Sequence, residues 1–418
     1  MRSNFRVGFK EVNSSLCVEG VPLSDIAKDY GTPTYVYSTE SLKKNFNAYF
    51  SSVRERDKVC FSVKSNSNIH ILELMKNLGS GFDVVSGGEL KKCLIVGAKP
   101  ENIVFSGVGK SLDDIELALE NNIYSINVES EKELERIITL ARANGKKANC
   151  SIRINPDIFL KSHKYIRTGH KASKFGLSKT STLKAIERAL NSGQINLIGL
   201  ASHIGSQIRN KALVFKNLNN LIEIFCELKD LGISLEMIDI GGGLPIPYNK
   251  NDPKIQVSGL LKEVISKVSE LDINLVFEPG RSISGNAGIL LTRVEYLKKT
   301  STRNFAILDA GMNDFLRPSL YDAWHNISNI EASKELAVNY YLVGPVCESA
   351  DTLGEERLLS LDEDSILAIH DSGAYGHVMS SNYNSRTRPS EVLVEDCEIK
   401  LIRRRESFED LISQETNL

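Results

Sequence analysis

The sequence predicts an α/β protein: a (β/α)8 barrel with a second, mostly β C-terminal domain that includes the N-terminal segment. Three observations support this prediction. Short β-rich runs alternate with helical stretches between residues 59 and 277. After about residue 285 the rhythm changes to strand-like runs with few helices between them. A length of 418 residues also suits one large domain plus another. We therefore expect a barrel at 38–285 and a β-rich domain made of 1–37 plus 286–418.

The elements follow in order from the N-terminus. Thr34–Tyr37 predicts a strand, and Ser38-Thr39-Glu40 predicts the start of a helix. Farther on, Ser130 and Glu133 predict a capping box, and Gly145 ends the helix that it starts. The eight strands expected to close the barrel are Val59–Val63, Phe82–Val85, Ile103–Phe105, Ser125–Val128, Ser151–Ile154, Ile198–His203, Met237–Ile240 and Leu275–Phe277.

An open, doubly wound sheet is the alternative fold. No GxGxxG opens a helix after the first strand, which disfavours a dinucleotide-binding version of it. Beyond the barrel, the expected strands of the β-rich domain are Ile289–Tyr296, Phe305–Leu308, Ser365–Ile369 and Glu391–Val394.

Composition excludes several classes of protein. The 51 basic and 53 acidic residues are nearly balanced and form no basic stripe, so we expect no nucleic-acid partner. The seven cysteines show neither CxxC pairs nor metal-ligand spacing, which predicts no metal site and a reducing compartment. No apolar run approaches the roughly 20 residues of a membrane span, and the N-terminus lacks a signal peptide. We expect a cytoplasmic protein without a membrane partner.

Lys64 stands where the first barrel strand ends, and active sites of such barrels lie at the C-terminal ends of the strands. Burying a lysine there as a cation is costly, which favours the neutral, nucleophilic amine. Such an amine can form a Schiff base with a carbonyl compound. The alternative is a lysine that extends from the strand end into solvent.

Other strand ends carry residues suited to a phosphorylated, planar ligand. Gly241-Gly242-Gly243 and Gly280-Arg281 follow the last two strands, where backbone N–H groups can bind a phosphate. Glu278 can pair with a protonated ring nitrogen or with a neighbouring arginine. His203, near Ser206, can stack on a planar ring, although a lone histidine is more often a satisfied core residue.

The β-rich domain holds three further candidates. Cys347 lies beside Glu348 in a loop bounded by Pro and Ser, where a thiol can donate a proton. Arg317 and Tyr321 can bind a carboxylate together. Tyr375 is presented by a turn at 371–376. Ordinary surface loops would explain each of these equally well.

Taken together, these segments resemble the fold-type III pyridoxal-phosphate decarboxylases, and within them the enzymes that act on meso-2,6-diaminopimelate. The similarity covers nearly the whole chain in the correct order. The matching segments are Phe61-Ser62-Val63-Lys64-Ser65-Asn66, Phe82-Asp83-Val84-Val85-Ser86-Gly87-Gly88-Glu89-Leu90, Ile152-Arg153-Ile154-Asn155-Pro156, Ser173-Lys174-Phe175-Gly176, His203-Ile204-Gly205-Ser206-Gln207, Gly241-Gly242-Gly243, Glu278-Pro279-Gly280-Arg281, Arg317-Pro318-Ser319-Leu320-Tyr321-Asp322, Gly344-Pro345-Val346-Cys347-Glu348-Ser349, Asp371-Ser372-Gly373-Ala374-Tyr375 and Arg386-Thr387-Arg388-Pro389.

The resemblance implies a role for each candidate. Lys64 would hold pyridoxal 5'-phosphate covalently, His203 would stack on its ring, and Glu278 would keep the ring nitrogen protonated. Cys347 would donate the proton that completes the reaction. The other cofactor-binding residues would be Ser206, Gly243, Pro279, Gly280, Arg281 and Tyr375. The substrate-binding residues would be Arg281, Arg317, Tyr321, Glu348 and Tyr375.

The implied reaction is decarboxylation of meso-2,6-diaminopimelate to L-lysine and carbon dioxide, the last step of lysine biosynthesis. The implied assembly is a homodimer with shared active sites, in which the Cys347 loop enters the partner's barrel mouth. Arg167 departs from the family pattern, which has a small polar residue there near the distal end of the substrate. The alternatives are a related decarboxylase for another basic or carrier-bound amino acid, a racemase, and a non-catalytic cofactor-binding homologue.

Overall fold

The chain divides into two compact units. A computed structural model describes residues 7–158, 168–169, 173–249 and 251–416. One unit consists of Phe46–Pro245 and Pro253–Ser282, and the other of Met1–Asn45, Ile246–Asp252 and Ile283–Leu418. The domain limits expected from the sequence, 38–285 and 1–37 with 286–418, stay a prediction.

The first unit contains a closed barrel of eight parallel strands, so the predicted (β/α)8 fold is confirmed. Each strand overlaps its predicted run, with ends that differ by a few residues. Around the barrel the order is β10, β11, β12, β5, β6, β7, β8, β9. The strands are β5 (Lys58–Ser62), β6 (Gly81–Val84), β7 (Ile103–Phe105), β8 (Ser125–Val128), β9 (Ala148–Arg153), β10 (Ile195–Ala201), β11 (Met237–Asp239) and β12 (Asn274–Phe277).

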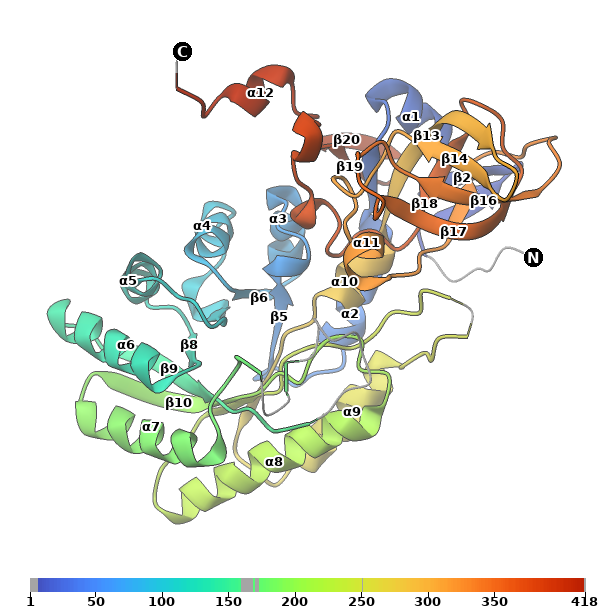
Figure 1. Cartoon of the computed structure of the whole chain (residues 1–418). Coiled ribbons are helices and arrows are strands. Elements are labelled where there is room, and N and C mark those ends of the chain that lie inside the picture. The colour runs from blue at the N-terminus through green and yellow to red at the C-terminus, as the bar shows by residue number, and fades with distance from the viewer. Residues whose placement is uncertain (1–6, 159–167, 170–172, 250, 417–418) are drawn as a thin grey trace. The chain divides into compact units, whose positions relative to one another are not determined.

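Helices lie on the outside of these strands, as Figure 1 shows for α4 to α8. The helices are α2 (Thr39–Phe50), α3 (Ile69–Asn77), α4 (Gly87–Ile95), α5 (Leu112–Asn121), α6 (Glu131–Ala143), α7 (Lys179–Ser192), α8 (Lys211–Asp230), α9 (Val257–Lys267) and α10 (Arg281–Ser284). None of the helices in the described ranges is both long and apolar enough to cross a membrane.

Helix α6 begins as predicted, but half of its expected capping box is absent. The Ser130 side chain accepts a hydrogen bond from the Glu133 backbone N–H. The Glu133 carboxylate accepts instead from the backbone N–H of Glu129, 2.6 Å away, and forms an ion pair with Lys110. The carboxylate pairs with the buried Lys110 and not with the exposed N-terminus of the helix, because an unpaired buried cation costs more free energy than an unpaired N–H group that water can reach.

The inward-facing residues change from apolar to polar along four strands of the barrel, β5, β7, β11 and β12. Successive side chains of a strand point to opposite faces, so residues two apart share the interior. Cys60, Val104, Met237 and Val276 pack together in the interior. Two residues further along the same strands stand Ser62, Ser106, Asp239 and Glu278, all buried. The C-terminal end of the barrel therefore has a polar interior.

The second unit is built on two antiparallel or mixed sheets. The strands predicted at Thr34, Ile289, Phe305, Ser365 and Glu391 are all present, and the N-terminal strand β4 pairs with β13 and β19 in this unit. The smaller sheet contains β1 (Phe9–Val12), β2 (Ser15–Val18) and β3 (Val21–Pro22). The larger sheet contains β4 (Thr34–Ser38), β13 (Gly288–Lys299), β14 (Asn304–Leu308), β15 (Ile327–Asn329), β16 (Val338–Val343), β17 (Thr352–Leu359), β18 (Ile366–Ile369), β19 (Ser390–Glu395) and β20 (Glu398–Arg403).

Strands β15, β16, β17 and β20 were not predicted from the sequence. Of these, β17 and β20 lie at the two ends of the sheet order, where charged residues are tolerated. The core of this unit is apolar, with Val36, Ile289, Leu291 and Val392 fully buried. The remaining helices of the unit are α1 (Leu23–Tyr30), α11 (Arg317–Tyr321) and α12 (Phe408–Ile412).

Candidate active site at the barrel's C-terminal end

Lys64 lies directly beyond β5, in a single 3-10 turn, η1 (Val63–Ser65). Its Nζ is 2.5 Å from Oδ2 of Asp83, and its side chain keeps 33% of its exposed surface. The same Asp83 oxygen accepts a hydrogen bond of 2.8 Å from the Ser62 hydroxyl. The other oxygen of Asp83 is buried and has no hydrogen-bond partner among the described residues. The lysine is thus held by a buried carboxylate that retains unused hydrogen-bonding capacity.

Two more buried carboxylates lie in the same polar interior. Asp239 and Glu278 are hydrogen-bonded to each other through their side chains. Asn127 Nδ2 donates to Asp239 Oδ2 at 3.1 Å, and the Ser106 hydroxyl donates to Glu278 Oε1 at 3.2 Å. With Asp83, three buried acids therefore share this interior, and Asp83 is the one that contacts Lys64 directly.

Burial decides the protonation of this cluster, because it disfavours the charged form of a carboxyl group. Burial raises the pKa of Asp239 to about 6. Burial, followed by the negative charges of Asp239 and Asp83, raises the pKa of Glu278 well above its usual range. The environment of Glu278 therefore favours its protonated form, whose proton it can share with a basic nitrogen placed against it.

The triple-glycine loop after β11 approaches the neighbouring backbone more closely than any side chain would allow. Gly241 and Gly243 have φ angles of +69° and +96°. A Cβ on Gly242 would lie 2.0 Å from the carbonyl oxygen of Glu278, and one on Gly243 would lie 2.0 Å from that of Gly205. These positions require glycine for both conformation and space.

His203 follows β10 and is tied to the same loop. Its Nδ1 accepts a hydrogen bond of 3.2 Å from the backbone N–H of Gly242. Burial lowers the pKa of His203 well below its usual range, and the positive charges of Arg153 and Lys64 lower it further. The imidazole is therefore neutral, and a neutral aromatic ring is suited to stacking on a planar ligand.

Arg281 links the ends of β12 and β10. Its Nε and one terminal nitrogen donate to the Ser206 hydroxyl at 3.2 and 3.1 Å. Pro279 accepts a hydrogen bond of 3.0 Å from the backbone N–H of Ser62, and a Cβ on Gly280 would lie 3.0 Å from the Ser62 side chain. These contacts join β12 to β5, its neighbour in the barrel.

The barrel unit brings eight predicted site residues onto the ends of four adjacent strands, β10, β11, β12 and β5. They are Lys64, His203, Ser206, Gly243, Glu278, Pro279, Gly280 and Arg281. Sequence reasoning missed Asp83 and Asp239. The sequence features that could have identified them are an acid, Asp83, inside the apolar run of β6, and an acid, Asp239, two residues after Met237 on the same inward face.

A second buried charge network occupies the same barrel. Lys110 donates three hydrogen bonds of 2.8 Å each, to the carbonyl oxygens of Gly107 and Asn127 and to Glu133 Oε1. Glu129 forms an ion pair with Arg153. This network was not predicted either, because its residues are typical of helix caps and strand ends.

In the β-rich unit, Arg317 and Tyr321 lie together on α11. The Arg317 guanidinium is buried, and it donates to the Tyr248 hydroxyl at 3.1 Å and to His325 Nε2 at 3.3 Å. The carbon of the guanidinium is 5.8 Å from the centre of the Tyr321 ring. Tyr248 comes from the segment Ile246–Asp252, which is inserted in sequence between two parts of the barrel unit.

The remaining predicted residues lie on loops of the same unit. Cys347 and Glu348 are exposed, on the loop between β16 and β17. Tyr375 follows β18 and has a left-handed φ of 55°. Arg167 lies outside the described residues.

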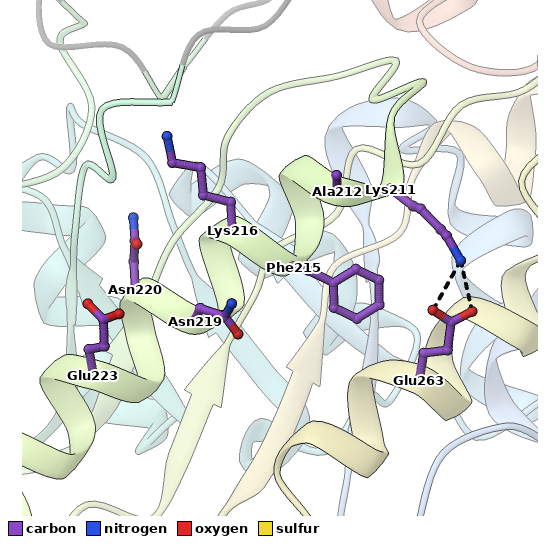
Figure 2. Close-up of a pocket in the computed structure, with 8 residues that line it drawn as sticks. All are labelled: Lys211, Ala212, Phe215, Lys216, Asn219, Asn220, Glu223 and Glu263. Carbon is purple, nitrogen blue, oxygen red and sulfur yellow. Dashed lines mark hydrogen bonds and ion pairs between the residues drawn. The ribbon is translucent and has the colours of Figure 1, made fainter.

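A groove on the outer surface of the barrel unit lies away from these residues. Figure 2 shows this groove, of about 570 Å³, between α8 and α9, lined by Phe215 and polar side chains and spanned by the Lys211–Glu263 ion pair. No predicted site residue lines it. A small cavity of about 30 Å³ lies behind the glycine loop and is lined by Gly241, Gly242, Phe277 and other largely apolar residues.

Several known proteins similar to this chain carry the name diaminopimelate decarboxylase. Residues 39–285 match the family described as pyridoxal-dependent decarboxylase, pyridoxal binding domain. The chain is 43% identical to a diaminopimelate decarboxylase of Pseudomonas aeruginosa, over 98% of this chain and 99% of that protein.

Solved structures similar to this chain include enzymes with the same name. Diaminopimelate decarboxylase of M. jannaschii in complex with L-lysine superposes with a TM-score of 0.93 at 36% identity, covering 99% of this chain and 98% of that one. The Helicobacter pylori enzyme, also with L-lysine, has a TM-score of 0.90 at 41% identity, covering 94% and 99%. Because the family model matches residues 39–285 and the similarity to these relatives runs over nearly the whole chain, this chain belongs to the pyridoxal-dependent decarboxylases, in the family of the diaminopimelate decarboxylases.

Proposed function

We propose that this chain removes one carboxylate of meso-2,6-diaminopimelate to give L-lysine and carbon dioxide, with pyridoxal 5'-phosphate as its cofactor. The observation that carries this proposal is the placement of one lysine among three buried carboxylates beside a triple-glycine loop. The relatives solved with L-lysine support the same product.

The residues at the barrel end fit the cofactor. A protonated pyridine nitrogen brings a donor and a positive charge, and the cluster supplies a buried excess of acids. Asp83 also retains a buried oxygen without a partner among the described residues, which suits a cationic group near Lys64. The glycine loop offers backbone N–H groups where a phosphate is commonly bound in such barrels.

Each barrel residue then has a definite task. Lys64 would bind the aldehyde carbon of the cofactor through Nζ, and Asp83 would hold that amine in place. Glu278 would share its proton with the ring nitrogen. His203, neutral and fixed by Gly242, would pack against the ring face.

The phosphate would be bound where strand ends meet. The hydroxyl of Ser206 and the guanidinium of Arg281 are already within hydrogen-bond distance of each other, which places a donor group and a cation together. The other proposed phosphate ligands are Gly243, Gly280 and Tyr375, and Pro279 shapes the loop that presents them.

Substrate recognition falls mainly to the β-rich unit. Arg317 and Tyr321, with Arg281 and Tyr375, would bind a substrate carboxylate, because a guanidinium matches its geometry. Glu348 would bind the distal ammonium group. We further propose a cytoplasmic homodimer in which the loop carrying Cys347 and Glu348 completes the partner's site. The barrel at 38–285 would be the cofactor-binding domain, and 1–37 plus 286–418 the β-rich domain.

The bound cofactor supplies a conjugated cationic ring that accepts an electron pair. The chain orients the substrate so that one bond from the α-carbon to its carboxylate can break, and that carboxylate leaves as carbon dioxide. Cys347 then delivers a proton from its thiol to the same carbon. Buried Glu278 holds the charge of the ring nitrogen constant throughout.

The proposal is tested by Lys64→Ala. The purified variant should lack the visible absorbance of the covalently held cofactor and should release no carbon dioxide from meso-2,6-diaminopimelate. Lys64→Arg is the matched control, because it keeps a cation beside Asp83 but has no amine able to hold the aldehyde. It should lose the same absorbance and turnover.

A substrate panel tests specificity. Wild-type protein should release carbon dioxide from meso-2,6-diaminopimelate and not from ornithine, arginine or L-lysine. Retention of both absorbance and turnover in Lys64→Ala, or equal turnover of ornithine, would refute the proposed function.

A further inference from the structure

Two consecutive residues of one turn contact two consecutive residues of the Cys347 loop. The turn is η6 (Tyr383–Ser385). Oδ1 of Asn384 accepts a hydrogen bond of 3.0 Å from the backbone N–H of Cys347. The Tyr383 hydroxyl lies near the Glu348 carboxylate, which raises the pKa of Tyr383.

The η6 turn is itself firmly held. Asn382 Nδ2 donates to the Arg386 carbonyl oxygen at 3.0 Å, a bond that joins the two residues on either side of the turn. It also donates to Glu406 Oε2 at 2.6 Å, which connects the turn to the segment after β20. Asn384 and Ser385 have left-handed φ angles of 55° and 54°, which L-residues seldom adopt unless their surroundings require it.

The loop's other support comes from Asp351. Its Oδ2 accepts from the backbone N–H of Val346 at 2.7 Å, and its Oδ1 accepts from that of Met312 at 2.6 Å. Cys347 and Glu348 are exposed between this anchor and the η6 turn. Because exposed side chains on a loop otherwise sample several rotamers, contacts from η6 restrict where both functional groups point.

We propose that Asn384 and Tyr383 are positioning residues for the reaction, Asn384 through Cys347 and Tyr383 through Glu348. This inference rests on the proposed function. Asn384 fixes the backbone from which the Cys347 thiol projects, so it governs proton delivery. Tyr383 fixes the carboxylate that receives the distal ammonium, so it governs substrate binding. One turn therefore sets the separation between the proton donor and the distal binding group.

The two roles predict different kinetic defects. Asn384→Gly removes the hydrogen-bond acceptor, and glycine tolerates the left-handed backbone. The variant should lower kcat about tenfold and leave KM near the wild-type value, because one hydrogen bond that matters in the reacting state is lost. Asn384→Asp keeps an acceptor oxygen and a residue suited to this backbone, so it should restore kcat.

A second readout follows the thiol directly. In the cofactor-bound protein without substrate, the rate of Cys347 alkylation by iodoacetamide is measured by peptide mass spectrometry, with exposed Cys397 as the internal reference. The ratio of the two rates should change in Asn384→Gly and return toward wild type in Asn384→Asp. A turn that merely stabilises the fold would leave this ratio unchanged.

Tyr383→Phe removes only the hydroxyl that lies near Glu348. It should raise KM for meso-2,6-diaminopimelate about tenfold with little change in kcat, because an interaction with a charged group is lost. Tyr341→Phe is the matched control: Tyr341 donates to Glu356 at 2.9 Å, another exposed tyrosine–glutamate pair in the same unit, and its loss should leave both parameters unchanged. The effect of Tyr383→Phe should also disappear in a Glu348→Gln background.

The outcomes separate this inference from the proposed function. If Cys347→Ala and Glu348→Gln keep wild-type turnover, the proposed roles of the loop are wrong. If both of those variants are impaired while Asn384→Gly and Tyr383→Phe match wild type in KM, kcat and alkylation ratio, the positioning roles are overturned and the proposed function stands.

Discussion

Two groups of buried charges lie in the same barrel and differ in their balance. The first pairs two cations, Lys110 and Arg153, with two carboxylates, Glu133 and Glu129. Each donor hydrogen of Lys110 has an acceptor, so the group is complete within the protein. We therefore infer a structural role for Lys110, because a fully paired ammonium group offers nothing further to a ligand.

The second group sets Lys64 against Asp83, Asp239 and Glu278, with more acids than cations. Such an arrangement is unfavourable in the isolated chain, and the raised pKa values of Asp239 and Glu278 express that cost. Adding a cationic ring would relieve it. Lys64, the proposed cofactor-binding lysine, therefore differs from Lys110 in the incomplete charge balance of its group and not in burial alone.

The largest expected effect on stability is in the first group, at the buried Lys110–Glu133 ion pair. Lys110→Met keeps the length of the side chain but leaves Glu133 buried without its cation, which should lower the free energy of unfolding by about 3–5 kcal/mol. Urea denaturation of the cofactor-free protein measures this loss. Lys110→Met/Glu133→Gln should recover part of it.

Lys64→Met is the comparison variant for that measurement. Its loss should be clearly smaller, because the Lys64 side chain is 33% exposed and its surroundings can take up a proton. Equal losses in Lys110→Met and Lys64→Met would abolish the distinction between the two groups.

A smaller effect, of opposite sign, is expected at Glu278. Glu278→Gln mimics the protonated acid and can donate to Asp239, so the cofactor-free variant should be more stable than wild type at pH 8. Carbon dioxide release should nevertheless fall strongly, because an amide cannot share a proton with the ring nitrogen.

The pH dependence gives the sign of this effect. The folded pKa of Glu278 is raised above the unfolded value of 4.5, so its stability contribution is complete below pH 4.5 and is lost as pH rises through the folded pKa. The advantage of Glu278→Gln should therefore vanish near pH 4.5 and grow as pH increases. An advantage that stayed constant from pH 4.5 to pH 8 would contradict the raised pKa.

The smallest effect belongs to an exposed pair. Lys211 Nζ lies 3.1 Å from both oxygens of Glu263, with 59% and 50% of the two side chains exposed (Figure 2). Because water screens such pairs, Lys211→Ala should change the free energy of unfolding by less than about 1 kcal/mol. A loss comparable to that of Lys110→Met would show that burial does not separate these ion pairs.

Much of the barrel could be predicted because its local signals agree. Each predicted strand combined β-branched residues with a turn or helix signal after it, and all eight are present. Lys64 and the glycine loop could be found for the same reason: each follows a recognisable strand. Strands β17 and β20 escaped prediction because edge positions accept charged residues, which hide the apolar pattern. Strand β16 lies inside the sheet and was missed as well, so edge position does not account for every missed strand.

The capping of α6 shows where local reasoning stops. Ser130 and Glu133 have the spacing of a capping box, but Lys110 takes the Glu133 carboxylate. The competing contact comes from 23 residues away in sequence and cannot be read from the helix alone.

By itself, the sequence determined the alternation of strands and helices, the position of the lysine at a strand end and the glycines of the loop, because these follow from local periodicity and backbone preference. Only the tertiary structure decided that Asp83, Asp239 and Glu278 share one interior with Lys64. Closure of the barrel sets the parallel strand ends side by side, so acids far apart in the chain are buried together. Their burial, and then their mutual repulsion, favours the protonated form that the proposed chemistry uses.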